Sequence, residues 1–537
     1  MDDSETSEDS DDEPLSSLVP QTATNTESSS RSNRPYRWAK KEYHPPDTSF
    51  TGPAVIPPQD QDLKSPYEYF QKFVTHDMLD NVVENTNLYS VQKSGVSTNT
   101  TRIEIEQVIS MFFRMGLVRM SSVRQYWEAE SSYEPVSGVM ARNRFQHLLT
   151  QLHFVDNATA TEDEKKDKLW KIRPWLKSMR EQCLVTTPDE RCSIDEMMCQ
   201  YRGQTSPIRQ YIKSKPHPWG FKIWGRAGVN GILHDFDVYQ GGDGKRTQLG
   251  QGGDVVVKLV STLPQKSNYK IYADNLFTSV PLMAKLIADG FHYTGTVRQN
   301  RLPNCTMATE KELKKKGRGS FDYRIEQQHN ISVVRWYDNR AVTLASTHIC
   351  VDPQQTAKRW DKTQKKQLEI HMPSIVREYN QHMGGVDMLD SFLAKYRFRL
   401  RSRRWYTYLF WHFLSIALVN AWLLYRRDYL MLRLPTKKIL SQRRFQSHVA
   451  AALILVNTQR KRGRSSTSSP LPLTKRKISN LPCVDVRKDK TAHWPAKTEK
   501  KGRCRLCEKN NTNTVCTKCD VRLCFVDDRN CFVKFHL

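Results

Sequence analysis

The sequence has little that would place the chain in a membrane or outside the cell. Its first thirteen residues carry eight acids and no lysine or arginine, so they do not resemble the basic, then apolar, start of a secretion signal. One long apolar run, residues 406–425, is long enough to cross a bilayer. It contains His412, Ser415 and Asn420 and is basic on both sides, so no charge asymmetry would orient it. We therefore expect a helix buried in a large core, and no membrane partner.

A complete nucleotide-binding loop is also lacking. The glycine-rich stretch 241–254 contains GDGKRT, but Tyr239 stands where a phosphate-binding loop needs its first glycine. We expect a flexible loop there and no nucleotide cofactor. No internal repeat is visible. Twelve cysteines in a chain without an export signal argue against a disulfide framework.

Positive charge is abundant. The 537 residues have a formal net charge of +26 and a pI of about 9.5. The basic residues gather beside aromatics, which favours a polyanionic partner such as nucleic acid over general solubility charge. A chain of this length exceeds one compact core, so several domains are expected.

Composition and hydrophobic periodicity divide the chain into eight segments. Residues 61–190 show helical spacing, whereas from about residue 191 three strands precede alternating helices and strands, which is typical of an α/β domain. The predicted segments are a disordered acidic tail (1–60), a helical region (61–190), an α/β core (191–300), a basic insertion (301–370), the rest of the core (371–396), a second helical part (397–459), a basic linker (460–502) and a cysteine-rich unit (503–537). Two basic clusters in the linker, 460–464 and 475–477, suit a bipartite nuclear import signal, so we expect a nuclear protein.

Four aspartates are candidates for chemistry. Asp195 lies near the end of the first predicted strand, and Asp274 closes a later one. Asp387 and Asp390, three residues apart, share one face of a predicted helix. Strand ends of an α/β sheet meet at one crevice, and clustered carboxylates attract hard cations such as Mg²⁺ or Mn²⁺. The alternative is that such aspartates only cap turns and helices.

The C-terminal end predicts zinc binding. Cys504 and Cys507, and then Cys516 and Cys519, form two CxxC pairs, and three further ligand types follow at Cys524, Cys531 and His536. One site would use Cys516, Cys519, Cys531 and His536. The other would use Cys504, Cys507 and Cys524, with Asp527, Asp528 or His493 as a fourth ligand.

Three ordered blocks, CSIDEMMCQYRG, YADNLFTSVPLM and YNQHMGGVDMLDSF, resemble the catalytic blocks of the piggyBac transposase family. Weaker matches lie in WGFKIWGRAG, HYTGTVRQNR and the run from Arg401 to Tyr425, so the likeness covers about 66–425 and the cysteine-rich end. The resemblance implies an RNase H-like domain with an insertion, a helical dimerisation and DNA-binding region from both flanks, and a cross-brace zinc finger.

The resemblance also implies an activity, namely cut-and-paste transposition at TTAA sites by a dimer. Asp195, Asp274 and Asp387 would then hold Mg²⁺ or Mn²⁺, with Asp390 as a fourth acid. The alternative is a domesticated DNA-binding or chromatin protein that lost transposition. Arg401, Arg403, Arg404 and Trp405 are candidates for contacting DNA, with Trp405 stacking on an unpaired base or else packing in the core.

Overall fold

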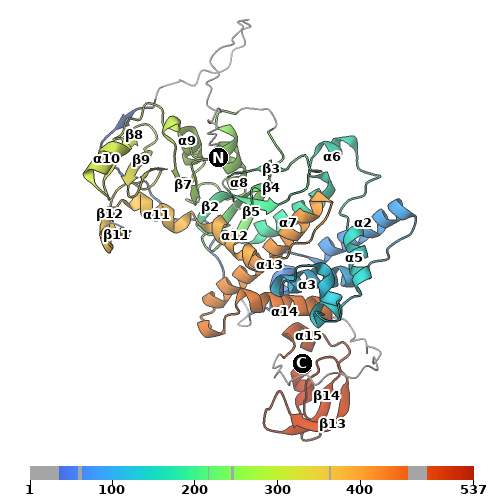
Figure 1. Cartoon of the computed structure of the whole chain (residues 1–537). Coiled ribbons are helices and arrows are strands. Elements are labelled where there is room, and N and C mark those ends of the chain that lie inside the picture. The colour runs from blue at the N-terminus through green and yellow to red at the C-terminus, as the bar shows by residue number, and fades with distance from the viewer. Residues whose placement is uncertain are drawn as a thin grey trace, which may run out of the picture.

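The computed structural model describes residues 36–57, 63–213, 215, 217–242, 247–361, 364–456 and 481–537 (Figure 1). Residues 1–35 of the predicted acidic tail lie outside the described residues, as do both basic clusters of the predicted import signal.

The N-terminal segment 36–57 is ordered, which corrects the prediction that disorder extends to residue 60. Its strand β1 (Trp38–Ala39) pairs antiparallel with β8 (Phe321–Glu326). The Trp38 indole donates to the Pro303 carbonyl over 2.9 Å, and the Phe50 ring packs edge-on against Tyr269 at 4.9 Å. The polar composition of this segment concealed a few aromatic anchors, each of which buries enough apolar surface to hold the chain.

A helical body forms from both sides of the α/β region, as predicted (Figure 1). Tyr69 near its start donates to the Asp428 carboxylate over 2.8 Å, and Gln446 donates to the Phe113 carbonyl over 2.8 Å. Side-chain caps at Ser65, Thr75 and Thr101 begin its first three helices. The helices are α1 (Pro66–Gln71), α2 (His76–Ser94), α3 (Arg102–Leu117), α4 (Glu134–Ser137), α5 (Arg142–Gln151), α6 (Glu162–Lys166), α7 (Arg173–Val185), α13 (Trp405–Met431) and α14 (Gln442–Leu455), with 3-10 turns η1 (Val123–Trp127), η2 (Trp170–Ile172) and η4 (Thr436–Lys438).

Helix α13 contains the long apolar run. Among the described residues it is the one helix long and apolar enough to cross a membrane, and 89% of its most apolar window is buried inside the protein. Its Asn420 amide bonds both the amide and the carbonyl of Leu233 at 3.0 and 2.9 Å. A polar residue inside the run is thus satisfied by a strand of the sheet, and the predicted core helix is confirmed.

The sheet at the centre of the α/β region begins with three antiparallel strands, as expected. They are β2 (Arg191–Gln200), β4 (Trp219–Gly228) and β5 (Leu233–Val238). Strands β6 (Lys270–Ala273) and β7 (His292–Thr296) follow in parallel beside β2, joined by α9 (Val280–Ala288). Helix α8 (Gly250–Val260) precedes β6 and starts inside the glycine-rich stretch, so the loop predicted over 241–254 ends five residues early.

Residues 301–370 do not stand apart from this sheet, in contrast to the predicted insertion. Strand β10 (Ala341–Ser346) pairs with β7, and β9 (Ser332–Tyr337) and β8 continue outward to β1. Only β11 (Gln355–Asp361) and β12 (Lys366–Met372) form a hairpin of their own. The remaining elements here are β3 (Gln210–Tyr211) beside β4, η3 (Gln299–Arg301) and α10 (Glu310–Lys316).

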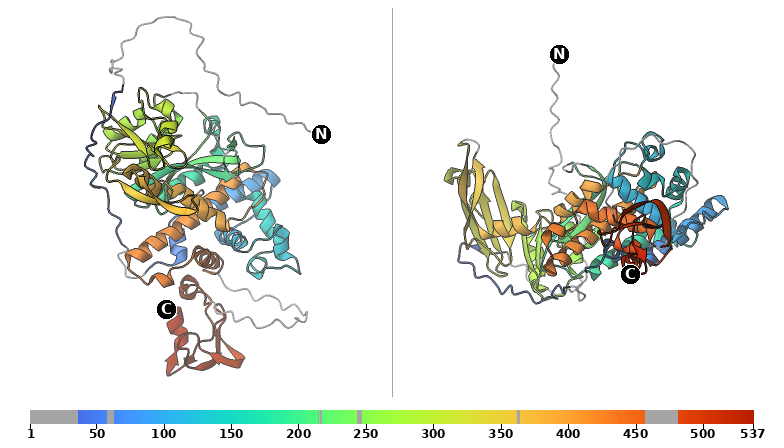
Figure 2. Two further views of the ribbon diagram at one scale, coloured as in Figure 1. Left: turned by 60° about the vertical axis from the view of Figure 1, so that its left-hand side comes forward. Right: turned by 90° about the horizontal axis from the view of Figure 1, so that it is seen from below.

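The C-terminal unit starts earlier than predicted. Helix α15 (Val484–Lys488) lies within the predicted linker 460–502, yet the Val486 side chain is only 1% exposed and belongs to the core of the helical body. The unit then contains β13 (Pro495–Arg503), β14 (Asn511–Cys516), β15 (Phe525–Val526), β16 (Arg529–Asn530) and α16 (Cys531–His536). Figure 2 shows this unit at the end of the helical body away from the sheet.

Candidate active site

Strand pairing brings the first two aspartates together. Strands β2 and β6 are parallel neighbours, and their register pairs Ile194 with Ala273. Asp195 and Asp274 are the next residues along the two strands, so they lie side by side where this parallel pairing ends. Asp274 directly follows β6, as predicted, but Asp195 is the fifth of the ten residues of β2 and still pairs with β4, so the prediction that it lies near the end of its strand is wrong. Each accepts a backbone N–H, from Glu196 and Leu276 respectively, over 2.7 Å.

Helix α12 (Gly385–Tyr396) carries the other two aspartates to that edge, after α11 (Ser374–His382). It packs on β2 and β4, where a Cβ on Gly385 would lie 2.4 Å from the Gly228 carbonyl oxygen of β4 and 2.6 Å from the Ser193 hydroxyl oxygen of β2. Asp387 in its first turn is exposed, whereas Asp390, one turn on, is half-buried. The glycine is needed because any side chain would push the helix away from the strands.

Burial and mutual repulsion shape the protonation of the cluster. Burial, opposed by the Glu196 hydrogen bond and reinforced by the charges of Asp274 and Asp387, raises the pKa of Asp195 to about 7. Burial likewise raises the pKa of Asp274, and it raises the pKa of Asp390 to about 6. The cluster therefore holds more negative charge than it can solvate, which is the condition that favours a bound divalent cation.

The donor set fits a hard metal ion. Carboxylate oxygens, here from the middle of β2, the end of β6 and the start of α12, are the ligands that Mg²⁺ and Mn²⁺ prefer. Among the described residues the tight groups of possible ligands, with atoms within 4.8 Å of one another, are two Cys/His sets rather than the aspartates. Like charges hold carboxylates apart until a cation draws them in.

The capping alternative applies in part to Asp274. One of its oxygens accepts the Leu276 N–H in a local turn. The next helix, α9, is capped instead by Ser279, whose hydroxyl accepts from the Leu282 N–H over 3.4 Å. A second carboxylate oxygen of Asp274 is thus not needed for the helix.

Two residues of the site were missed from the sequence. The positive charge of Lys215 partly offsets the rise in the pKa of Asp195, Asp274 and Asp390. The Lys215 ammonium also donates to the Glu196 carbonyl over 3.2 Å. Tyr379 on α11 is acted on by the charges of Asp274, Asp195 and Asp387, and burial raises its pKa to about 12. Tyr379 opens the block YNQHMGGVDMLD, which was a usable signal; nothing in the spacing pointed to Lys215.

The predicted DNA-contact residues divide into two kinds. The Arg401 and Arg403 side chains are exposed beside the start of α13. Arg404 instead donates to the Leu152 carbonyl over 2.9 Å and lies over the Tyr89 ring. Trp405 is half-buried and meets the Phe221 ring edge-on at 6.0 Å. Core packing thus accounts for part of Trp405 and leaves part of its indole accessible.

The C-terminal ligands form two complete groups, in a different pairing from the predicted one. Cys504, Cys507, Cys524 and Cys531 make one, and His493, Cys516, Cys519 and His536 make the other. Cys531 thus completes the set of Cys504, Cys507 and Cys524, so neither Asp527 nor Asp528 is required there. In the other set, His493 stands where Cys531 was predicted. In α16, Cys531 and His536 are five residues apart, about 140° around a helix, and so face different sites.

The histidines of the second group are oriented for ligation. The His493 Nδ1 lies 3.4 Å from the Cys516 sulfur and 3.5 Å from that of Cys519, while its Nε2 pairs with Asp489 at 3.0 Å. The His536 Nδ1 donates to the Phe532 carbonyl over 2.7 Å, which leaves Nε2 as its ligand atom. A carboxylate or carbonyl behind the ring is the usual support for a metal-binding histidine.

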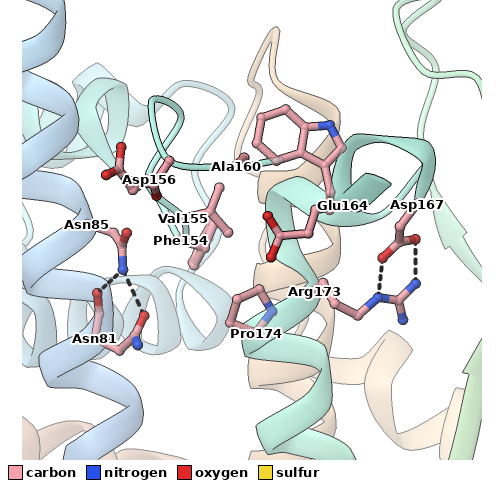
Figure 3. Close-up of a pocket in the computed structure, with 12 residues that line it drawn as sticks. Asn81, Asn85, Phe154, Val155, Asp156, Ala160, Glu164, Asp167, Arg173 and Pro174 are labelled. Atoms are coloured by element: carbon pink, nitrogen blue, oxygen red, sulfur yellow. Dashed lines mark hydrogen bonds and ion pairs between the residues drawn. The ribbon is translucent and has the colours of Figure 1, made fainter. Parts of the chain in front are cut away.

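A pocket of about 460 Å³ lies elsewhere, between α2, α6 and α7 (Figure 3). Its acids are already engaged: Asp167 pairs with Arg173 at 2.5 Å, and Asp156 accepts from Gln92 over 2.6 Å. It contains none of the predicted site residues, and we assign it no chemistry.

Comparison with known proteins gives a consistent result. The family model described as Transposase IS4 matches residues 65–422. The human PiggyBac transposable element-derived protein 3 is 31% identical over 500 residues, covering 90% of this chain and 79% of that protein. The human PiggyBac transposable element-derived protein 2 is 31% identical over 482 residues, covering 88% and 77%. The cryo-EM structure of the piggyBac transposase synaptic complex with hairpin DNA shares the fold, with a TM-score of 0.62, 20% identity and coverage of 86% of this chain and 97% of that one.

Proposed function

Because this chain belongs to the piggyBac transposase family, we propose that it cuts DNA at transposon ends and joins those ends to TTAA target sites. The observation that carries the proposal is the meeting of Asp195 and Asp274, side by side on β2 and just after β6, with the first turn of α12. Fold similarity and family membership support DNA as the substrate, and the basic charge of the chain agrees with it.

In this proposal Asp195, Asp274 and Asp387 hold Mg²⁺ or Mn²⁺, and Asp390 supports them from the same helix. The bound ions would supply Lewis acidity for an in-line attack by water or a 3′-hydroxyl on phosphorus. The backbone N–H groups of Glu196 and Leu276 orient the carboxylates of Asp195 and Asp274. Exposed Arg401 and Arg403 bind phosphates, and the accessible part of Trp405 stacks on an unpaired base.

The strand order supports an RNase H-like assignment for the catalytic domain. Along the sheet the order is β5, β4, β2, β6 and β7, with the first three antiparallel and the last two parallel to β2. This is the arrangement that three antiparallel strands followed by two crossovers produce. We further propose that the chain acts in the nucleus as a homodimer through the helical body.

For the C-terminal unit we propose a cross-brace finger with two zinc ions. The two ligand groups interleave along the chain, because Cys504 and Cys507 join Cys524 and Cys531, while His493 and the middle CxxC pair join His536. Thiolate and imidazole ligands in fours select Zn²⁺. The basic strand β13 then offers a surface for transposon-end DNA.

Asparagine substitution tests the active site directly. Asp195→Asn, Asp274→Asn or Asp387→Asn should each abolish Mg²⁺-dependent nicking of labelled duplex DNA and leave DNA affinity intact, since the change removes charge with little change in volume. Asp163→Asn, on the exposed face of α6, is the matched control and should cut normally. Full activity in any one of the three variants would refute this assignment of the triad.

The same assay decides between the transposase and a transposase-derived DNA-binding protein. The relatives from the human genome bear names that describe them as transposable element-derived, which is the observation that favours the second function. Binding without any metal-dependent cleavage by the unaltered chain would establish it in place of the transposase.

A further inference from the structure

The hairpin β11–β12 presents an exposed tryptophan. Trp360 has 59% of its surface exposed, and Lys358 on the same face is exposed too. The pairing places Trp360 opposite Gln367 and Lys358 opposite Glu369. We call these four residues, with Thr356 and His371, the outer face of the hairpin. No core packing explains a tryptophan there, because the hairpin buries its other face.

The inner face fixes the hairpin to the sheet. The Trp336 indole donates to the His371 carbonyl over 2.9 Å, and the Arg359 guanidinium lies 3.1 Å from the Asp338 carboxylate. Arg318 joins Asp338 to Asp361 on β11. The outer face is therefore held in a defined orientation instead of swinging on a loose arm. Figures 1 and 2 show the hairpin projecting on the side opposite α2 and α5.

Strand register locates the hairpin relative to the aspartates. Ala273 on β6 is level with Gly295, Gly295 with Ala345, and Ala345 with Val333 on β9. Asp338 follows β9 and lies four residues beyond the level of Asp274, which is roughly 13 Å along the strand direction. Strand β9 is three strands away from β6, which is roughly 14 Å across the sheet. The hairpin thus extends the side of the sheet that carries the aspartates, by a distance that equals the length of about six base pairs of duplex DNA.

This flank is strongly basic. Lys365 and Lys366 are exposed at the tip of the hairpin, and Lys314, Lys315 and Lys316 are exposed in the last turn of the neighbouring α10. The helical body contacts the sheet from the other side, through α7 on β5 and α13 on β2. A duplex lying over the aspartates from the helical body would continue across the hairpin.

We infer that the outer face of the hairpin binds the duplex DNA that lies beyond the cleaved or attacked phosphate, on the side away from the helical body. This inference rests on the proposed function. Lys358 and Lys365 contact phosphates, and Trp360 is the apolar wedge that enters the minor groove and opens a base step.

Fluorescence anisotropy of the full chain on a 30-base-pair duplex with a central TTAA tests the inference. Trp360→Ala should weaken binding about 5- to 100-fold, in the range of a lost aromatic contact with a base, and Trp360→Phe should restore most of it. Lys358→Gln with Lys365→Gln should lower the slope of log affinity against log salt by about 1.8. The matched control, Lys165→Gln with Lys166→Gln on the exposed face of α6, should leave the slope unchanged. Wild-type affinity in both hairpin variants overturns the inference.

Two further measurements separate the inference from its rivals. If Trp360→Ala converts a dimer into a monomer in sedimentation, the outer face contacts a second copy and the DNA assignment is overturned. Repeating the anisotropy series in an Asp195→Asn background should give the same losses, because binding precedes cleavage. If the unaltered chain never cleaves DNA while Trp360→Ala still weakens binding, the transposase proposal fails and the hairpin surface stands.

Discussion

Among single residues, Glu106 shows how burial can act on the stability of the whole helical body. Its side chain lies on α3, the residue is only 9% exposed, and the His76 Nε2 is 4.0 Å away. Burial, partly offset by the charge of Arg102, raises the pKa of Glu106 to about 7. A raised carboxyl pKa means that the folded protein prefers the neutral form, so the contribution of Glu106 to stability is fully present below about pH 4 and is lost as the pH rises from there through about 7.

Glu106→Gln should remove that loss, because glutamine stays neutral at every pH. The variant is expected to match the wild type near pH 4 and to exceed it by roughly 2–3 kcal/mol at pH 8. Urea unfolding at the two pH values measures the difference. A constant offset between the proteins would mean that Glu106 does not titrate in this range.

Gly385 is a second residue whose substitution has a testable effect, in this case on the candidate active site. Gly385→Ala adds a Cβ 2.4 Å from the Gly228 carbonyl oxygen and must displace α12 from β2. A shift of about 1 Å in Asp387 should lower the rate of Mg²⁺-dependent nicking about 100-fold with little change in DNA affinity. Gly384→Ala is the matched control, since its Cβ meets no atom within 4 Å. Equal rates in the two variants would contradict the close-approach argument.

The sequence predicts the acidic residues of the site better than its other members. Asp274 follows a strand end and the α12 pair has helical spacing, both of which are recognisable patterns, whereas Asp195 lies in the middle of β2 and not at the predicted strand end. Lys215 comes from a loop whose path no periodicity describes. The exchange of Cys531 and His493 between the zinc groups depends on α16 being a helix, and a helical wheel of that segment would have indicated it.

At the scale of elements, the C-terminal finger should depend on metal for its fold. His493→Ala is expected to reduce bound zinc from two ions per chain to one, because it removes one of four ligands from the second group. Metal analysis of the purified protein gives the count. His76→Ala, at an exposed histidine outside the finger, should leave two ions. Loss of both ions from the His493 variant would show that the two sites fold as one unit.

Helix α15 attaches the finger to the body. Val486 is 1% exposed in the core of the helical body, whereas Val484, on the same short helix, is 45% exposed. Val486→Asp should detach α15 and make the segment before the finger sensitive to limited proteolysis, at a cost of several kcal/mol for a buried unpaired charge. Val484→Asp should be digested like the wild type. Similar digestion of both variants would place the attachment elsewhere.

The sequence predicts well those elements that have a single, clear hydrophobic periodicity. The burial of α13 and the three first strands follow from composition and alternation. The ordered segment 36–57 and α15 escaped prediction because each is held by a few isolated side chains in otherwise polar sequence. The sheet position of β8 to β10 was missed because strand pairing across a crossover leaves no local signal.

At the scale of the whole molecule, the N-terminal and C-terminal parts of the helical body depend on each other. Helix α1 packs against α13 and α14, so the helical body exists only when segments more than 330 residues apart have met. The α/β region between them must therefore bring its own two ends close together. The hydrogen bond from Asn420 to the Leu233 carbonyl joins the helical body to the sheet. The hydrogen bond from Tyr69 to Asp428 joins the N-terminal and C-terminal parts of the helical body.

That arrangement has a consequence for biosynthesis. At about 5–20 residues per second, a ribosome needs tens of seconds to travel from α1 to the end of α13. During this interval α1 and α3 have emerged with their apolar faces uncovered, while the sheet that follows them can already collapse. The β1 partner on β8 is likewise made long after β1 itself. The N-terminal helices of the nascent chain thus stay uncovered until its later half has been made. The yield of folded protein should therefore depend on chaperones that shield apolar helices.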